Sequence, residues 1–222
     1  MVEPIIQLKN VSFRYPESKF SIHCDNLVLR KKEVTLFIGE NGSGKTTLLK
    51  LCCGILKPDE GQLFINGENA NKWPLGKIGK NIGYLFQEPS RQLFTATVWE
   101  EMNFAGRILG EDSEKMRKKA ADLLNQVSMM ALADRSIYRL SRGEKQRLAI
   151  AAILMQDIQY LILDEPTTGL DSEQRASLYG LLERLIEGGL GIAIISHDKN
   201  VISNFNSRKI EIVKGGIVNE KS

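Results

Sequence analysis

One short segment, residues 39–46 with the sequence GENGSGKT, constrains the fold more than any other part of the chain. It matches the pattern G-x-x-x-x-G-K-[ST], in which a glycine-rich loop joins the end of a strand to the start of a helix. The apolar run Val34–Ile38 precedes the segment, and a helical stretch, Lys45–Cys53, follows it. The sequence therefore predicts a strand, a loop and a helix in this order.

Loops of this kind bind phosphate groups through their backbone. Glycine lets the chain turn tightly, so that successive N–H groups point inward, and the helix N-terminus adds a positive partial charge. We expect Lys45 to hold the β and γ phosphates of a nucleotide and the Thr46 hydroxyl to bind Mg²⁺. The predicted nucleotide-binding residues of the loop are Gly39, Asn41, Gly42, Ser43, Gly44, Lys45, Thr46 and Thr47.

A second feature, the acidic pair Asp164-Glu165, follows the apolar run Tyr160–Leu163. Ligands of open α/β sheets lie beyond the carboxyl ends of the strands, which is where these acids are expected. Asp164 can hold the magnesium ion through water, and Glu165 can polarise an attacking water as general base. The pair therefore adds hydrolysis to the predicted nucleotide binding.

The pattern around these motifs indicates an α/β core. Gly191–Ile195 is a third short apolar run of the kind that forms buried parallel strands. Ser172–Glu187 carries leucines on one side and ends at two glycines, as a helix does. Asp171 and Gln174 form a predicted capping box at its start.

Both ends of the chain contain hairpin signals. Ile5–Tyr15 and Gln62–Ile65 are predicted strands, and Asn66-Gly67 is a predicted tight turn. Residues 214–216 form a second hairpin candidate near the C-terminus. We therefore expect an antiparallel edge on the sheet.

Strand-like runs disappear between about Glu88 and Asp157, where helical periodicity replaces them. The basic cluster Lys115–Lys119 lies on one of the predicted helices and is interpreted as a solvated face. The apolar face of that helix consists of Met116, Ala120, Leu123, Leu124 and Val127.

Composition excludes several classes of protein. Lys and Arg number 30 against 27 Asp and Glu, a net charge of +3, which gives no indication of a nucleic-acid partner. No apolar run reaches the roughly 18 residues of a membrane span, and the first ten residues contain no signal core, so we expect a cytosolic chain that reaches a membrane only through a partner. The three cysteines, with Cys52 and Cys53 adjacent, are interpreted as buried free thiols.

The base of the nucleotide is less well defined by the sequence. No N-K-x-D motif that would read guanine occurs, because Asn71-Lys72 is followed by Trp73-Pro74. Tyr15 is an aromatic residue that could stack on adenine, although core packing is nearly as good an explanation.

Further motifs give a resemblance to a known family. Residues 140–144, LSRGE, look like the L-S-G-G-Q signature, and Gln87, after the run Ile82–Phe86, looks like a glutamine loop. Gly169-Leu170-Asp171 looks like a D-loop, and Ser196-His197-Asp198 looks like a histidine switch. With these motifs in this order, nearly the whole chain resembles the ATP-binding subunit of an ATP-binding cassette (ABC) transporter.

The resemblance implies a role for each matching residue, with ATP and Mg²⁺ as ligands. Tyr15 would stack on adenine, Gln87 would contact magnesium and sense a membrane partner, and His197 would contact the γ-phosphate. Ser141 would act in trans, on ATP held by a second subunit. The implied catalytic residues are Glu165, His197 and Gln87, the implied metal ligands Thr46, Gln87 and Asp164, and the implied nucleotide ligands outside the loop Tyr15, Ser141, Gly143 and Asp171.

The signature departs from the family pattern at two positions, since Arg142 replaces its first glycine and Glu144 its glutamine. Ser141 and Glu144 fit a capping box, so the segment should still begin a helix whose N-terminus points at a phosphate. The Glu144 carboxylate would repel that phosphate and the Arg142 guanidinium would attract it.

A subgroup is indicated by the segment after Gln87. Residues 87–94, QEPSRQLF, then residues 97–101, TVWEE, and Phe104 are similar to energy-coupling factor (ECF) ATPases, which drive vitamin and transition-metal uptake. Ser90 and Arg91 stand where acidic residues are usual in that subgroup.

The sequence thus predicts an α/β fold with a P-loop NTPase (RecA-like) parallel-sheet core, an antiparallel β edge and a helical subdomain. Residues 1–222 would form one domain, with the catalytic core in 1–87 and 158–222 and the helical subdomain, including the signature, in about 88–157. The chain would lie on the cytoplasmic face of the cell membrane and pair with a like or unlike second ATPase subunit. A coupling helix of a membrane-embedded transporter subunit would dock near Gln87.

Two other functions stay open at this point. A soluble ABC ATPase of DNA repair, chromosome structure or translation usually carries a long coiled coil or two cassettes, and neither fits the spacing between Lys45 and Ser141 or the single set of motifs. The second alternative is a catalytically weak nucleotide-binding subunit that pairs with an active sister subunit. The replacement of a signature glycine by Arg142 is the reason to consider it.

Overall fold

The computed structural model describes residues 3–109, 113–196, 205 and 207–221. The strands are β1 (Pro4–Arg14), β2 (Ser21–Arg30), β3 (Val34–Ile38), β4 (Glu60–Ile65), β5 (Glu68–Asn69), β6 (Ile82–Leu85), β7 (Tyr160–Asp164), β8 (Gly191–Ile195), β9 (Ser207–Val213) and β10 (Gly216–Lys221). The helices are α1 (Lys45–Cys52), α2 (Leu75–Gly79), α3 (Val98–Leu109), α4 (Ser113–Gln126), α5 (Arg142–Leu154) and α6 (Ser172–Glu187). Short 3-10 turns are η1 (Pro89–Gln92), η2 (Met130–Leu132) and η3 (Ile137–Arg139).

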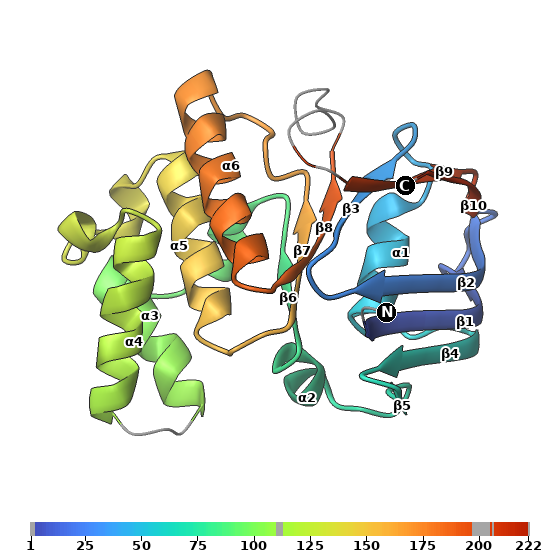
Figure 1. Ribbon diagram of the computed structural model, residues 1–222, viewed down its shortest axis with the longest axis horizontal. Helices are drawn as coiled ribbons and strands as arrows, with labels where there is room; N and C mark the ends of the chain where they lie inside the picture. The colour runs from blue at the N-terminus through green and yellow to red at the C-terminus, as the bar shows by residue number, and fades with distance from the viewer. Residues whose placement is uncertain (1–2, 110–112, 197–204, 206, 222) are drawn as a thin grey trace.

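All ten strands join one sheet, in the order β5-β4-β1-β2-β10-β9-β3-β8-β7-β6 (Figure 1). Strands β9, β3, β8, β7 and β6 run parallel, whereas β1 pairs antiparallel with both β2 and β4. In register, Phe37 and Asp164 both pair with Ile195. The carboxyl ends of β3, β7 and β8 therefore meet at one edge of the sheet, as the sequence predicts.

The central strands are apolar along their whole length because both faces of the sheet are covered. In β7, Leu161 and Leu163 pack into one hydrophobic cluster, while Tyr160 and Ile162 pack into another on the opposite face. This division follows from the alternation of side chains along a strand. These runs contain no alternation of polar and apolar residues, and the prediction of buried parallel strands from this pattern is confirmed.

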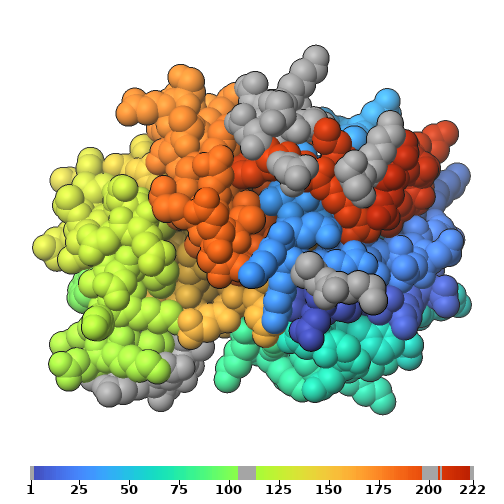
Figure 2. All heavy atoms as spheres, viewed as in Figure 1, coloured from blue at the N-terminus to red at the C-terminus, as the bar shows by residue number. Residues whose placement is uncertain are grey.

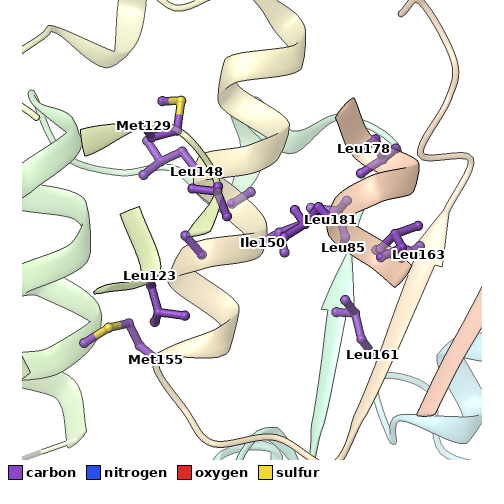
Figure 3. Packing of buried hydrophobic residues seen from close by; sticks show 14 of the residues in the cluster. Leu85, Leu123, Met129, Leu148, Ile150, Met155, Leu161, Leu163, Leu178 and Leu181 are labelled. Atoms are coloured by element: carbon purple, nitrogen blue, oxygen red, sulfur yellow. The ribbon is translucent and has the colours of Figure 1, made fainter. Parts of the chain in front are cut away.

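Helices from different parts of the chain cover the two faces. Helix α1 packs against one face, together with the antiparallel strands, and helices α5 and α6 pack against the other. Figure 3 shows side chains of α5 and α6 meeting those of β6 and β7. The helical segment shares this cluster with the sheet, so its hydrophobic contacts fix α5 relative to the core.

Helices α3, α4 and α5 lie between β6 and β7 in the sequence and stand side by side at one end of the molecule (Figure 1). The apolar face predicted for the second of them is buried, since Met116, Ala120, Leu123, Leu124 and Val127 all belong to the cluster. The basic cluster Lys115–Lys119 lies mostly on the outside of α4, and Lys119 forms an ion pair with Asp157 at 2.8 Å. The expected helical segment is present.

Strand β2 was not predicted. It buries Ile22 and Cys24 and then Leu27 and Leu29, so two exposed residues interrupt the alternation at its centre. Its pairing with β1 over most of its length makes it a strand. Long-range pairing, rather than a local pattern, therefore determines this element.

The N-terminal strands and the C-terminal hairpin pack side by side, as the blue and red atoms of Figure 2 show. Strand β10 pairs with β2 and with β9, and so links the antiparallel strands to the parallel ones. The turn predicted at residues 214–216 connects β9 to β10. All three cysteines are buried free thiols, as expected. None of the helices in the described part of the chain is both long enough and apolar enough to cross a membrane.

Candidate functional site

The glycine-rich loop between β3 and α1 wraps around the Lys45 side chain. Lys45 Nζ donates hydrogen bonds to the carbonyl oxygens of Gly39 at 2.9 Å and Glu40 at 2.8 Å. Gly39 has a φ of 143°, and a Cβ atom there would collide with the carbonyl oxygen of Ile212. The start of the loop is therefore restricted to glycine by the neighbouring strand β9.

Lys45 is a buried cation in an acidic setting. Its side chain is only 6% exposed, and burial lowers its pKa, while the charges of Glu165 and Asp164 act in the opposite direction. A buried ammonium group is favourable only with oxygen partners around it. The two loop carbonyls and the two carboxylates supply such an environment.

Asp164 is held by hydrogen bonds to both of its carboxylate oxygens. Thr46 Oγ1 donates to Oδ1 at 3.2 Å, and the Tyr84 hydroxyl donates to Oδ2 at 2.9 Å. Burial, followed by the Asp164 charge, raises the Tyr84 pKa, so this phenol stays protonated and remains a donor. Sequence reasoning missed Tyr84, although a tyrosine in the otherwise aliphatic strand β6 was a usable signal.

Glu165 leaves the strand in a different direction from Asp164. Its φ is 52°, a left-handed conformation that costs free energy for a residue other than glycine. Its N–H donates to the carbonyl oxygen of Ile195 at 3.0 Å, and its carboxylate accepts a hydrogen bond from Thr168 Oγ1 at 3.3 Å. The two carboxylates therefore have different hydrogen-bond partners.

A pocket of about 420 Å³ brings most of the predicted residues together. Gln87, an exposed residue of the segment after β6, also lines this pocket. The lining residues are Phe20, Asn41, Gly42, Gly44, Lys45, Thr46, Thr47, Gln87, Asp164, Glu165 and Ile195.

The donor set in this pocket fits a magnesium ion. A hydroxyl from Thr46, a carboxylate from Asp164 and an amide from Gln87 are hard oxygen ligands of the kind that Mg²⁺ prefers alongside nucleotide phosphates. The described ranges contain no group of three His, Cys, Asp or Glu side chains that could hold a metal ion, so a site here would depend on the hydroxyl and amide oxygens as well.

Tyr15 lies beside this pocket rather than in its wall. Its hydroxyl lies 3.4 Å from Thr47 Oγ1, and its ring packs edge-on against Phe13 with centroids 4.9 Å apart. Tyr15 still keeps 36% of its surface exposed. Tyr15 therefore packs against the core and also keeps an exposed part near Thr47.

Phe20 is the aromatic residue that lines the pocket, and sequence reasoning did not identify it. Atoms of its ring lie 3.0 and 3.4 Å from the position of a Cβ on Gly44. It also lines a second pocket, of about 630 Å³, together with Gly39, Ser43 and Lys214. Phe20 thus lies against the phosphate loop between the two pockets.

The signature segment, Leu140–Glu144, lies outside both pockets. Ser141 caps α5 by accepting a hydrogen bond from the Glu144 N–H at 3.2 Å, and the Glu144 carboxylate accepts one from the Ser141 N–H at 2.6 Å. The predicted capping box is therefore present, and the Glu144 carboxylate is turned back onto the helix start. Gly143 is buried beside Gln174, and Asp171 caps α6.

His197 lies outside the described residues, so the structure gives no position for it. Ser196, the residue before it, is buried, and its hydroxyl lies 3.5 Å from that of Thr167.

Comparison with known proteins identifies the family. Residues 22–168 match the model of the ABC transporter family. The chain belongs to this family. An energy-coupling factor transporter ATP-binding protein, EcfA, from Methanothermobacter thermautotrophicus is 37% identical over 97% of this chain, which spans 70% of that relative's length. The chain spans between 35% and 82% of the lengths of several other curated relatives.

Solved structures show the same fold. CbiO1 from Clostridium perfringens, described as part of the ABC transporter complex CbiONQ, superposes with a TM-score of 0.90 at 28% identity, covering 98% of this chain and 88% of that one. The cassette MJ0796 in a dimeric post-hydrolysis state with ADP and Pi gives 0.84 at 28% identity, covering 98% of both chains. The predicted P-loop NTPase fold is confirmed, and the ABC ATPase assignment with it.

Proposed function

We propose that this ABC ATPase powers an ECF-type importer of a vitamin or a transition-metal ion. The pocket that joins Lys45, Thr46, Asp164 and Glu165 carries the proposal, because it combines phosphate binding with a group that can activate water. The similarity to EcfA and to CbiO1 supports the transporter class. The choice of cargo would belong to other subunits.

Lys45 and the loop would bind the phosphate chain of ATP. The carbonyl oxygens that now accept from Lys45 Nζ are weak partners compared with phosphate oxygens, so the ammonium group would turn to the β and γ phosphates. Tyr15, beside Thr47, and Phe20, in the pocket wall, would contact the adenosine part. Both ends of the nucleotide would then be fixed by one chain.

Thr46, Asp164 and Gln87 would hold the magnesium ion, which when bound neutralises charge on the β and γ phosphates. Tyr84 would orient the Asp164 carboxylate through its hydrogen bond, since it is the buried donor to Oδ2. A hydrogen bond of this kind, to a residue that itself binds the metal, holds the carboxylate in a fixed orientation.

Glu165 would accept the proton of the attacking water. Its carboxylate lines the same pocket as Lys45, and the hydrogen bond from Thr168 limits its rotation. His197 would add the contact to the γ-phosphate that the family resemblance implies.

A second ATPase subunit would complete the site. Ser141 and Asp171 are exposed and lie outside their own chain's pocket, which supports a role for them and Gly143 toward ATP bound by the partner. The partner can be a like or an unlike chain. The pair would bind peripherally at the cytoplasmic face of the membrane, without nucleic acid.

The membrane partner would dock on the proposed helical subdomain, residues 88–157, near Gln87. Phe94 is 72% exposed, and its ring lies 6.5 Å from that of Phe104, so an apolar surface is available for a coupling helix. The Glu101 carboxylate, itself buried, accepts hydrogen bonds from the backbone N–H groups of Phe94 and Thr95 at 2.9 and 3.0 Å. These bonds would keep the aromatic surface in place.

The Glu165→Gln variant tests the proposal. We expect the variant to bind ATP, to lose at least about a hundredfold in kcat, and to double its mass in light scattering with MgATP but not with MgADP. Glu173→Gln, which changes an exposed acid at the start of α6, is the matched control and should hydrolyse ATP like the unchanged chain. A monomer in both nucleotides, with ATP binding shown separately, would exclude a homodimer and indicate an unlike partner.

A further inference from the structure

Arg142 makes contacts within its own subunit that the family's glycine at this position cannot make. Its Nη2 donates a hydrogen bond to the backbone carbonyl oxygen of Gln87 at 3.2 Å. This bond joins the first residue of α5 to the backbone of Gln87, a residue that also lines the pocket. An arginine in the signature therefore connects two parts of the chain that are far apart in sequence.

The stem of the same side chain lies against Gly169. A Cβ atom on Gly169 would be 3.2 Å from both Cδ and Nε of Arg142 and 3.3 Å from Cζ, which is tighter than nine in ten real Cβ contacts. The missing side chain at Gly169 thus leaves room for the guanidinium group. This glycine stands four positions after Glu165, in the turn that leads to α6.

Other residues of α5 fix its start to the same turn. The buried Gln146 donates from Nε2 to the carbonyl oxygen of Pro166 at 2.6 Å, and Gly143 packs against the side chain of Gln174. These contacts place α5 on the segment after Glu165 without involving Gln87. Arg142 adds to this arrangement a hydrogen bond from the start of α5 to the Gln87 backbone.

We propose that Arg142 is a positioning residue for ATP hydrolysis that acts within its own subunit. By holding the Gln87 carbonyl against α5 and the Gly169 turn, it fixes the backbone that directs the Gln87 side chain to the pocket. A guanidinium group bonded in this way is not the phosphate ligand in trans that its charge alone suggests. The inference rests on the ATPase function of the pocket.

The first test is hydrogen exchange of the complete chain, which reports on the Gln87 segment whether or not the chain hydrolyses ATP. In Arg142→Ala, we expect the amides of residues 86–92 to exchange at least about threefold faster, because local opening loses one restraint. The capping box of Ser141 and Glu144 remains in this variant, and alanine is a good helix former, so α5 should persist. Arg139→Ala removes an exposed arginine of η3 and is the matched control, for which no change is expected.

The second test separates kcat from KM. Because the loop and Lys45 hold the nucleotide, Arg142→Ala should lower kcat about tenfold and change the KM for MgATP by less than about twofold. Arg142→Lys keeps the charge without the planar fork and should recover only part of the lost kcat. In the Glu165→Gln background, Arg142→Ala should leave the ATP-dependent mass increase intact.

Unchanged exchange at residues 86–92 in Arg142→Ala would overturn the proposal. A loss of ATP-dependent dimerisation in Arg142→Ala, or full recovery of kcat in Arg142→Lys, would also overturn it, because both results indicate a phosphate contact in trans. A wild-type chain that does not bind MgATP would instead refute the proposed function, while the exchange result would still decide the position of Arg142.

Discussion

The phosphate-loop side of the chain and its signature side differ in how their polar residues are satisfied. Lys45 and Asp164 are 6% and 5% exposed, and each is bonded within its own chain. Ser141 and Arg142 are exposed at the start of α5. The polar groups of the phosphate-loop side are therefore buried and bonded within one chain, whereas the signature side exposes polar groups at the start of α5.

This difference has an energetic consequence. Removing a buried group leaves its former partners without a hydrogen bond in a region of low dielectric, whereas water replaces the lost partner of an exposed group. Substitutions on the phosphate-loop side should consequently have large effects in the isolated chain. Substitution of Ser141 on the signature side should have a small effect until a second subunit is present.

The largest effect is expected for Lys45→Ala. This change removes the cation for the β and γ phosphates and leaves the carbonyl oxygens of Gly39 and Glu40 without their donor. We expect the Kd for MgATP, measured by isothermal titration calorimetry, to rise at least about a hundredfold. Lys72→Ala, at an exposed lysine, is the control. An unchanged Kd in Lys45→Ala would show that the phosphate-loop side does not bind ATP through this lysine, and the two sides would then not differ as described.

The next effect concerns the base. Phe20→Ala removes the aromatic ring that lies against Gly44, and base stacking on an aromatic side chain is worth about 1–3 kcal/mol, so the Kd for ATP should rise about tenfold. Binding of inorganic tripolyphosphate, which has no base, should be unaffected. Phe20→Tyr should restore ATP binding, and an equal loss for both ligands would place Phe20 with the phosphate contacts instead.

A smaller effect is expected for Tyr84→Phe. The change deletes one hydrogen bond to Asp164 and keeps the buried ring, so the concentration of Mg²⁺ that gives half-maximal ATPase activity should rise about fivefold. Tyr138→Phe, at an 82% exposed tyrosine, should leave this concentration unchanged. An unaltered magnesium requirement in Tyr84→Phe would show that Thr46 alone suffices to orient the carboxylate.

The smallest effect in the isolated chain is expected for Ser141→Ala. Loss of the cap should lower the free energy of unfolding by about 1 kcal/mol, as measured by urea denaturation, because the Glu144 N–H loses its acceptor. The Kd of the single chain for ATP should change by less than about twofold, since Ser141 lies outside its pocket. A large loss of ATP affinity would contradict the division into two sides.

Local patterns were sufficient for much of the fold. Helix α6 begins and ends where its cap and its glycines indicate, and both predicted capping boxes are present. The buried strands β3, β7 and β8 were recognisable because apolar runs of that length leave few alternatives. These features depend on neighbours within a few residues, which a sequence contains explicitly.

Contacts between distant segments were beyond the sequence. Strand β2 forms because β1 pairs with it. Phe20 reaches the pocket, and Tyr84 reaches Asp164, because the fold brings distant segments together. The contact of Arg142 with Gln87 likewise joins residues on different elements.

The sequence by itself therefore predicted which residues bind phosphate and activate water, and it determined which residues cap α5 and α6, since such properties follow from side-chain chemistry and short spacing. Only the tertiary structure decided which of these groups share a pocket and which face away from it. Burial and hydrogen-bond partners depend on the packing of the whole chain, and no local pattern contains that information.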